Sequence, residues 1–397
     1  MPGFELFGEQ ERAEVQQVMD TGVLMRYGFD GMRKGQWKAR ELEKALEDKM
    51  KVKHAQLLSS GTAALTVGLA SAGIGAGDEV ILPTFTFVAS FEAVLALGAV
   101  PVLADVDNTL TLDPVAAEKS ITEKTKVIMP VHMCGSMGDL KTLKQLCEKY
   151  DLLLLEDACQ AIGGSYEGKA LGSYGDIGCY SFDYVKTITC GEGGALITNN
   201  SEFYRNADHY SDHGHDHIGT DRGAEGHPFL GYNYRISELN AAVGLAQISR
   251  LEEFIAIQKK NYSVIKEALS SIPEIEFRKV PNTGVENYSF LSFFLPTAKQ
   301  AKKAQLALGQ AGIDGCFYWF DNNWHYHTKW DHLKKLTSLG PFSKDVTTGI
   351  PDYSRSDFSK SDHWVGRNIS CLIKLGWTEE EVRNRASGMV TVLKEIL

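Results

Sequence analysis

The chain has 397 residues, of which 43% are hydrophobic and 23% charged, a composition typical of a folded protein with more than one core. Its formal net charge is −10 and it has no basic stripe, which argues against a nucleic-acid partner. No apolar run approaches the ~18 residues of a membrane helix, and the N-terminus lacks the features of a signal peptide, so we expect a cytoplasmic protein with no membrane partner. The seven cysteines show no C-x-x-C spacing, and we expect them to be reduced thiols.

The first part of the chain alternates helices and strands. Residues 9–21 and 37–50 have helical periodicity, and the basic, irregular stretch 23–36 between them is either a substrate-facing loop or a solvated connector. Apolar strands alternating with helices predict a mostly parallel sheet covered on both faces, with functional groups beyond the carboxyl ends of the strands. The predicted strands are 55–58, 79–82, 101–106, 127–131, 152–155, 177–182 and 195–198.

The second part has a different pattern. Residues 199–236 are rich in His, Asp, Gly and Tyr and contain few apolar runs, and a long helix with a break near Arg250 is predicted over 237–269. The remainder reads as a smaller α+β unit, so we predict two domains, 1–250 and 251–397. Its predicted strands are 275–280, 289–295, 313–319 and 369–373, its helices are 298–311 and 379–396, and an irregular aromatic segment occupies 320–364.

A single lysine follows the predicted strand 177–182. Lys186 stands among Cys, Tyr, Phe and Val residues, and a glycine cluster comes after it at 191–194. Desolvation makes a lysine amine more nucleophilic, so this amine is a candidate for covalent chemistry. Taken alone, however, the pattern is more typical of a loop lysine that reaches solvent.

Other polar groups stand at strand ends. The sequence S-S-G-T at 59–62 joins a strand to a helix, where free N–H groups bind phosphate, although Ser60 as an ordinary N-cap explains it equally well. Asp157 follows a fully apolar strand and could face the protonated nitrogen of a pyridine cofactor, with Gln160 on the same side. Phe87 could stack on a flat ring or pack in the core.

Two other patterns resemble known binding motifs but are better explained as a turn and a polar loop. Glycines 73, 75 and 77 lie between a helix and a strand, the reverse of a dinucleotide fingerprint, and indicate a turn. His213, His215 and His217 alternate in a polar loop. No familiar ligand spacing accompanies them, so a substrate-facing or solvated loop is expected and a metal site is not.

The combination of motifs is more specific than its parts. Five stretches occur in order, namely S-S-G-T-A-A-L at 59–65, P-T-F-T-F-V-A-S at 83–90, E-D-A-C-Q-A-I-G-G at 156–164, S-F-x-x-x-K followed by E-G-G at 181–194, and G-Y-N-Y-R-I-S-E-L-N-A-A at 231–242. Over essentially its whole length the chain resembles the DegT/DnrJ/EryC1/StrS sugar aminotransferases, which use pyridoxal 5′-phosphate. The resemblance implies the α/β architecture of fold type I (aspartate aminotransferase-like): a large domain with a mostly parallel, mixed sheet and a smaller C-terminal α+β domain.

The same resemblance implies roles for individual residues. Lys186 would bind the cofactor covalently and act as the catalytic residue, and Asp157 would hold the pyridine nitrogen. Asn233 would reach the phosphate of the other subunit, so that a homodimer shares its active sites. The remaining cofactor contacts implied are Phe87 stacked on the ring, Gln160 beside it, and Gly61, Thr62 and Ser181 at the phosphate.

Details within the family bear on the substrate. Many members have a histidine where Asp183 stands, and members that replace the lysine dehydrate sugars instead of aminating them. The stretches 182–194, 211–219, 314–319 and 322–326 most resemble members that aminate the C8 aldehyde of an oxidised 3-deoxy-manno-octulosonate for lipopolysaccharide, with L-glutamate as donor. A free sugar acid would need cationic or histidine donors, for which Arg26, His215 and His325 are the candidates. The alternatives are a nucleotide-linked 3- or 4-ketosugar aminotransferase and a non-catalytic cofactor-binding regulator.

Overall fold

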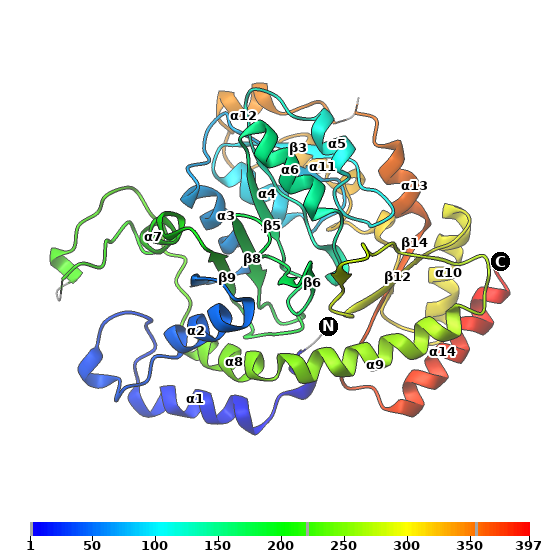
Figure 1. Ribbon diagram of the computed structural model, residues 1–397, viewed down its shortest axis with the longest axis horizontal. Helices are drawn as coiled ribbons and strands as arrows, with labels where there is room; N and C mark the ends of the chain where they lie inside the picture. The colour runs from blue at the N-terminus through cyan, green and yellow to red at the C-terminus, as the bar shows by residue number, and fades with distance from the viewer. Residues whose placement is uncertain (1–2, 220–221, 354–355) are drawn as a thin grey trace.

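The computed structural model describes residues 3–219, 222–353 and 356–397. At its centre lies a seven-stranded sheet of order β1-β9-β8-β5-β4-β2-β3 (Figure 1). Strands β8, β5, β4, β2 and β3 run parallel, and β9 is antiparallel to both of its neighbours, which confirms the mostly parallel, mixed sheet. The strands are β1 His54–Leu58, β2 Glu79–Pro83, β3 Val100–Ala104, β4 Thr125–Ile128, β5 Leu153–Asp157, β8 Ile177–Ser181 and β9 Gly194–Thr198.

Helices cover both faces of this sheet because its strands are apolar on both sides. Neighbouring residues such as Leu154 and Leu155 belong to different hydrophobic cores. One core contains residues of α2 (Lys38–Met50), α5 (Pro114–Lys119), α6 (Leu140–Tyr150) and α8 (Glu238–Ser249). The opposite core contains residues of α3 (Gly61–Ser71), α4 (Ala89–Ala96) and α7 (Ser201–Tyr210), and α1 (Glu9–Thr21) packs against α8.

The predicted break in the long helix is confirmed, because α8 ends at Ser249 and α9 (Leu251–Leu269) begins directly after Arg250. Beyond it, α9, α10 (Ala298–Gln310) and α14 (Glu379–Lys394) pack on an antiparallel sheet of order β10-β12-β14-β13. A capping box between Thr378 and Glu381 starts α14. The strands are β10 Glu276–Phe277, β12 Phe290–Phe294, β13 Cys316–Phe317 and β14 Asn368–Leu372. A third, small sheet pairs β11 (Gly284–Val285) with β6 (Ser165–Tyr166), which pairs with β7 (Lys169–Ala170).

Two predicted elements differ from the structure. The strand expected over 275–280 is only two residues long, because Arg278 donates to the carbonyls of Thr109 and Met133 and ties this segment to the central sheet's loops. Within the stretch 199–236, for which no helix was predicted, α7 forms, since the side chain of Asn200 accepts from the N–H groups of Glu202 and Phe203 and so caps the helix.

The aromatic segment 320–364 is also more ordered than predicted. It contains η6 (His327–Lys329), α11 (Asp331–Lys334), α12 (Lys344–Gly349), and most of η5 (Trp319–Asp321) and of α13 (Ser359–Arg367). Trp330, Leu333, Val346, Tyr353 and Phe358 join the core on the α3–α4 side of the central sheet. Although it follows residue 250, this segment therefore packs on the N-terminal part of the chain, and the division at residue 250 stays a prediction.

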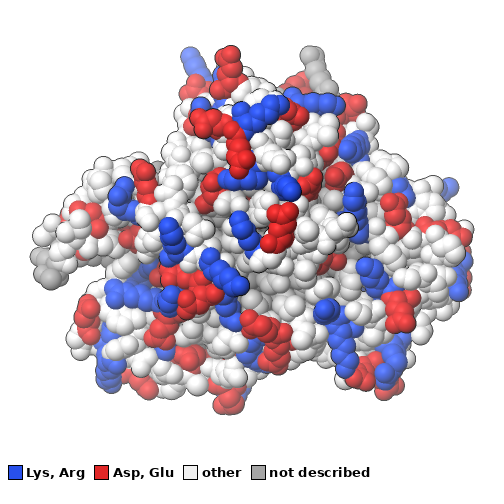
Figure 2. Space-filling model, in the orientation of Figure 1, with Lys and Arg blue, Asp and Glu red and all other residues white. Residues whose placement is uncertain are grey.

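Lys and Arg side chains are interspersed with Asp and Glu on the face shown in Figure 2. None of the described helices is both long and apolar enough to cross a membrane.

Candidate active site

A pocket of about 310 Å³ lies beyond the carboxyl ends of β5 and β8, at the N-terminus of α3. Seven of the residues predicted from the sequence line it, namely Gly61, Thr62, Phe87, Asp157, Gln160, Ser181 and Lys186, and so does His325. Parallel strands bring their carboxyl ends to one edge of a sheet, so residues distant in sequence meet there.

The start of α3 forms one end of the pocket. The Ser60 hydroxyl accepts from the N–H of Ala63 at 3.0 Å, so Ser60 is the N-cap, while the N–H groups of Gly61 and Thr62 have no partner among the described residues. A Cβ on Gly61 would come within 2.7 Å of the Ser181 Cβ and 3.1 Å of the Cys159 sulfur. Only glycine fits between the helix and β8, and this close approach leaves two N–H donors open for an anion.

Asp157 is buried at the end of β5. Its Oδ1 accepts from the N–H of Cys159 at 3.1 Å, and its Oδ2 accepts from the hydroxyl of Ser90 at 2.6 Å. Gln160 stands beside it; its Oε1 accepts from the N–H of Cys134 at 2.9 Å, which leaves the amide N–H groups to donate. The site therefore presents a fixed carboxylate and an amide donor.

Lys186 lies in the loop that connects β8 to β9. Its N–H donates to the carbonyl of Asp183 and its own carbonyl accepts from the N–H of Gly3, both at 3.0 Å, so the loop is held from two sides. The Phe4 and Tyr184 rings stack with centroids 4.3 Å apart. The Lys186 ammonium makes no ion pair or hydrogen bond with any described side chain and is available to a ligand.

Part of the pocket wall is aromatic. The rings of Phe87 and His325 have centroids 5.3 Å apart, and 41% of Phe87 is exposed. Residues 324–327 run antiparallel to 84–88, with the N–H of Thr86 donating to the carbonyl of His325 at 3.0 Å. An exposed aromatic face in a pocket can stack on a flat ring.

A sequence model of the DegT/DnrJ/EryC1/StrS aminotransferase family matches residues 6–350. The chain belongs to this family. It is 34% identical over 276 residues to a GDP-perosamine synthase of Escherichia coli O157:H7, covering 69% of this chain and 74% of that one. It is 36% identical over 287 residues to an L-glutamine:2-deoxy-scyllo-inosose aminotransferase of Streptomyces kanamyceticus, covering 69% and 66%. The X-ray structure of an aminotransferase from Psychrobacter cryohalolentis superposes with a TM-score of 0.86 at 25% identity, over 98% of both chains.

The protein is therefore a sugar aminotransferase of fold type I that uses pyridoxal 5′-phosphate, and not a non-catalytic regulator. The pocket fits this cofactor: free N–H groups at a helix start suit the phosphate, a buried carboxylate suits a protonated ring nitrogen, and an amine stands free. The assignment of each contact to Gly61, Thr62, Ser181, Phe87, Asp157, Gln160 and Lys186 stays a prediction.

Three predicted residues lie outside this pocket in the single chain. Arg26 is buried against another cavity, where it donates to Glu43 at 2.6 Å and to the carbonyl of Leu57 at 3.0 Å. His215 follows α7, with its Nδ1 3.0 Å from a Glu225 carboxylate oxygen. Asn233 is exposed beside Asp212, to which its strand segment pairs.

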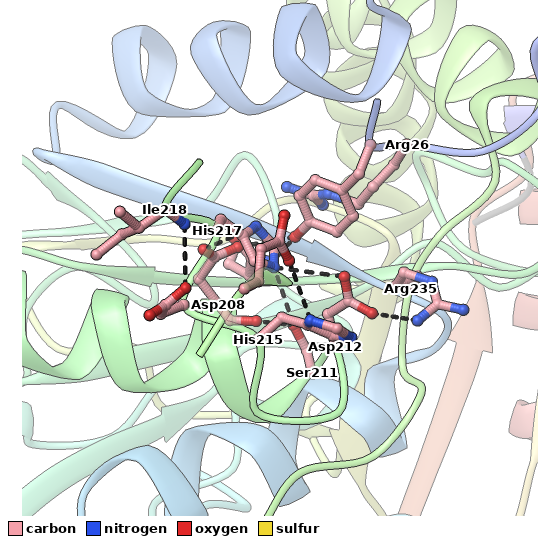
Figure 3. Close-up of polar contacts among 12 residues, drawn as sticks. Arg26, Asp208, Ser211, Asp212, His215, His217, Ile218 and Arg235 are labelled. Carbon is pink, nitrogen blue, oxygen red and sulfur yellow. Dashed lines mark hydrogen bonds and ion pairs between the residues drawn. The ribbon is translucent and has the colours of Figure 1, made fainter. Parts of the chain in front are cut away.

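The histidine loop is held by carboxylates. His217 lies 3.5 Å from Asp208 and 3.3 Å from Asp212, and Asp212 also pairs with Arg235 (Figure 3). Burial lowers the pKa of His217, but the hydrogen bond that it donates to Asp212 and the nearby carboxylates outweigh this effect, so the pKa is raised. In the described part of the chain no three His, Cys, Asp or Glu side chains converge as metal ligands.

Sequence reasoning missed two hydroxyl residues of the pocket. Thr86 and Ser90 are both fully buried and line the wall next to Asp157. Their spacing of four residues, at the start of a helix that follows a strand, puts both hydroxyls on one side, and this signal was available in P-T-F-T-F-V-A-S.

Proposed function

We propose that this enzyme transfers the amino group of L-glutamate to the C8 aldehyde of 8-oxo-3-deoxy-manno-octulosonate. The product, 8-amino-3,8-dideoxy-manno-octulosonate, would serve lipopolysaccharide biosynthesis, in the manner of the 8-amino-3,8-dideoxy-manno-octulosonate aminotransferase that the sequence resembles. The observation that carries this proposal is Asp183, which lines the pocket three residues before Lys186 where many family members have a histidine.

The charge of the pocket supports a substrate whose reactive end is neutral. Asp183 and Glu192 both line the pocket. Their carboxylates would repel a diphosphate held near the reacting carbon. In an oxidised octulosonate the carboxylate is at C1 and the aldehyde at C8, so the uncharged, hydroxylated end can enter while the acid stays outside.

Each residue of the pocket would have its own role in binding the cofactor or in moving a proton. When bound, pyridoxal phosphate supplies an electron sink for the carbon that loses its proton. The Nζ of Lys186 takes and returns this proton, because it is the amine that lines the pocket and makes no ion pair or hydrogen bond with a described side chain. Asp157, whose carboxylate is fixed by the hydroxyl of Ser90, would hold the protonated ring nitrogen. The N–H groups of Gly61 and Thr62 bind the phosphate.

The test compares two substrates with two amino donors. Enzyme loaded with pyridoxal phosphate is given the oxidised octulosonate or a GDP-linked 4-ketohexose, with L-glutamate or L-glutamine, and the aminated sugar is quantified. We expect efficient amination of the octulosonate with L-glutamate, and comparable turnover of the nucleotide sugar would refute the assignment. Lys186→Ala should keep the cofactor without a covalent bond and lose transfer, whereas Lys303→Ala, at an exposed residue outside the pocket, should not.

The second candidate is a nucleotide-linked 3- or 4-ketosugar. It is favoured by the 34% identity to a GDP-perosamine synthase. If it is correct, Asp183→His should leave turnover of the GDP-linked sugar intact or improve it. Under the octulosonate proposal, the same change should lower octulosonate turnover.

We also propose a homodimer with shared active sites. Asn233 is exposed and lies outside the pocket of its own chain. This position is expected for a residue that contributes to the active site of the partner subunit. The test is complementation between Lys186→Ala and Asn233→Ala, each inactive alone. A mixture refolded together should recover about a quarter of wild-type activity, because half of the dimers are mixed and each has one intact site. No recovery would refute sharing.

A further inference from the structure

His325 is fixed at the wall of the pocket by backbone pairing. The segment 324–327 lies against 84–88, where the N–H of Val88 donates to the carbonyl of Trp324 at 2.8 Å and the N–H of Thr86 donates to the carbonyl of His325 at 3.0 Å. The His325 ring lies between Phe87 and Trp319, with centroid distances of 5.3 and 4.5 Å. The imidazole therefore has little freedom, and it lines the same pocket as Lys186.

The hydrogen bonds of Asn322 determine which ring nitrogen of His325 carries the proton. The Oδ1 of Asn322 accepts from the backbone N–H of Trp324 at 2.9 Å, which identifies this atom as the amide oxygen. The same Oδ1 lies 2.7 Å from Nδ1 of His325. An amide oxygen can only accept, so Nδ1 must donate and holds the proton.

The other nitrogen, Nε2, then carries a lone pair. It makes no hydrogen bond with any described residue. Burial and the positive charge of Lys186 lower the pKa of His325 to about 3, so the ring is neutral at physiological pH. His325 therefore offers the pocket an acceptor, and it cannot be the cationic donor that the sequence suggested for a substrate carboxylate.

We propose that Nε2 of His325 accepts a hydrogen bond from the substrate hydroxyl on the carbon next to the carbonyl. The enzyme would thus select α-hydroxy aldehydes or ketones. In the octulosonate this group is the C7 hydroxyl. The inference rests on the proposed function only in taking the substrate to be a sugar, and any sugar whose carbonyl has a hydroxyl-bearing neighbour would satisfy it. Asn322 acts as a positioning residue that holds the acceptor form of the ring.

The test uses two small aldehydes that differ by this hydroxyl. Enzyme carrying the amino form of the cofactor, pyridoxamine phosphate, is mixed in single turnover with glycolaldehyde or acetaldehyde, in wild type and in His325→Phe. For each protein we take the ratio of the rate with glycolaldehyde to the rate with acetaldehyde. Dividing the ratio for wild type by the ratio for the variant cancels the intrinsic reactivity of the two aldehydes. We expect this quotient to be about ten, the effect of one lost hydrogen bond to a neutral partner. A quotient of one would overturn the proposal.

Three variants control the experiment. His363→Phe makes the same change at an exposed histidine outside the pocket and should give a quotient of one against wild type. Asn322→Leu removes the constraint on the ring and should lower the preference for glycolaldehyde several-fold, as expected for a lost positioning residue. His325→Gln, whose side-chain oxygen can accept in place of Nε2, should retain part of the preference if His325→Phe folds poorly.

A measurement without substrate tests the proton assignment directly. In protein labelled with ¹⁵N-histidine, the His325 signals are assigned by their loss in His325→Gln. We expect a protonated Nδ1 and an unprotonated Nε2 in wild type, and a mixture of tautomers in Asn322→Leu. A protonated Nε2 in wild type would overturn the inference. Because neither experiment uses the octulosonate, a wrong sugar assignment and a wrong role for His325 give separate results.

Discussion

The hydroxyl of Ser90 donates to Oδ2 of Asp157 at 2.6 Å, and Thr86 Oγ1 lies 2.6 Å behind it. An ionised carboxylate only accepts, so the single proton of Ser90 points to Asp157. The donor in the contact between Thr86 and Ser90 is then the Thr86 hydroxyl, which also lies 3.2 Å from the carbonyl of Phe87. With the N–H of Cys159 on Oδ1, the carboxylate has a donor on each oxygen. This relay therefore fixes the position of the Asp157 carboxylate.

Ser90→Ala should therefore weaken cofactor binding. The variant removes the Oδ2 donor and allows the carboxylate to turn. We expect pyridoxal phosphate to bind about five- to tenfold more weakly, near 1 kcal/mol, measured by absorbance titration of the apo-enzyme. Thr86→Val keeps the Ser90–Asp157 bond and should have a smaller effect. Equal affinity in wild type and Ser90→Ala would show that the relay does not position Asp157.

Gly61→Ala should reduce phosphate binding at the start of α3. The added Cβ would meet the Ser181 Cβ at 2.7 Å. Ser181 belongs to β8, a packed strand of the central sheet that cannot move freely. We expect the affinity for both pyridoxal phosphate and inorganic phosphate to fall at least tenfold, in keeping with the 1–3 kcal/mol cost of overpacking. Gly75→Ala is the matched control, because its Cβ would meet nothing within 4 Å. Unchanged affinity in Gly61→Ala would contradict the phosphate assignment.

The predicted residues that line the pocket share one property. Asp157 and Ser181 end strands β5 and β8, while Gly61 and Lys186 lie in the first few residues after β1 and β8, and parallel strands bring such positions together whatever the length of chain between them. Their positions could therefore be predicted from the local sequence together with the parallel topology of the sheet. The apolar strands and the helix break at Arg250 were predictable from the local sequence alone, since each is encoded by adjacent residues.

What the sequence could not predict depends on contacts between distant segments. Arg26 looked like a substrate ligand because it stands in an irregular basic stretch. In the fold Arg26 pairs with the buried carboxylate of Glu43 on α2, and no pattern in the neighbouring sequence indicates this pairing. The proton position on His325 likewise depends on Asn322 and on the pairing of 324–327 with 84–88, more than two hundred residues earlier.

The buried pair of Arg26 and Glu43 should contribute mainly to stability. Glu43 accepts from Arg26 and from the N–H of Leu57 at 2.8 Å, and only 4% of Arg26 is exposed. Glu43→Gln should cost about 3–5 kcal/mol of unfolding free energy, because it leaves a buried guanidinium uncompensated. The double change Arg26→Met with Glu43→Leu should recover most of this loss in urea unfolding. If Glu43→Gln is as stable as wild type, Arg26 is free to act elsewhere.

His327 should make stability depend on pH between about 4 and 6.5. Both ring nitrogens are buried without a partner in the described part of the chain, and the ring packs against Phe358 with centroids 4.8 Å apart. Burial, with the nearby charge of Lys334, lowers the pKa of His327 to about 4, below the unfolded value of about 6.5. The unfolded chain therefore binds this proton first, and the stabilising effect is complete above pH ~6.5 and is lost as the pH falls toward 4.

His327→Phe keeps the ring and removes the titration. Between pH 7 and pH 5 wild type should lose about 2 kcal/mol more unfolding free energy than the variant, since each pKa unit corresponds to about 1.4 kcal/mol and about 1.5 units of the shifted range lie in this window. Urea unfolding of the apo-enzyme at both pH values measures the difference. His363→Phe, at an exposed histidine, should follow wild type. Equal pH slopes for wild type and His327→Phe would mean that folding does not lower the pKa of His327, which would contradict this prediction.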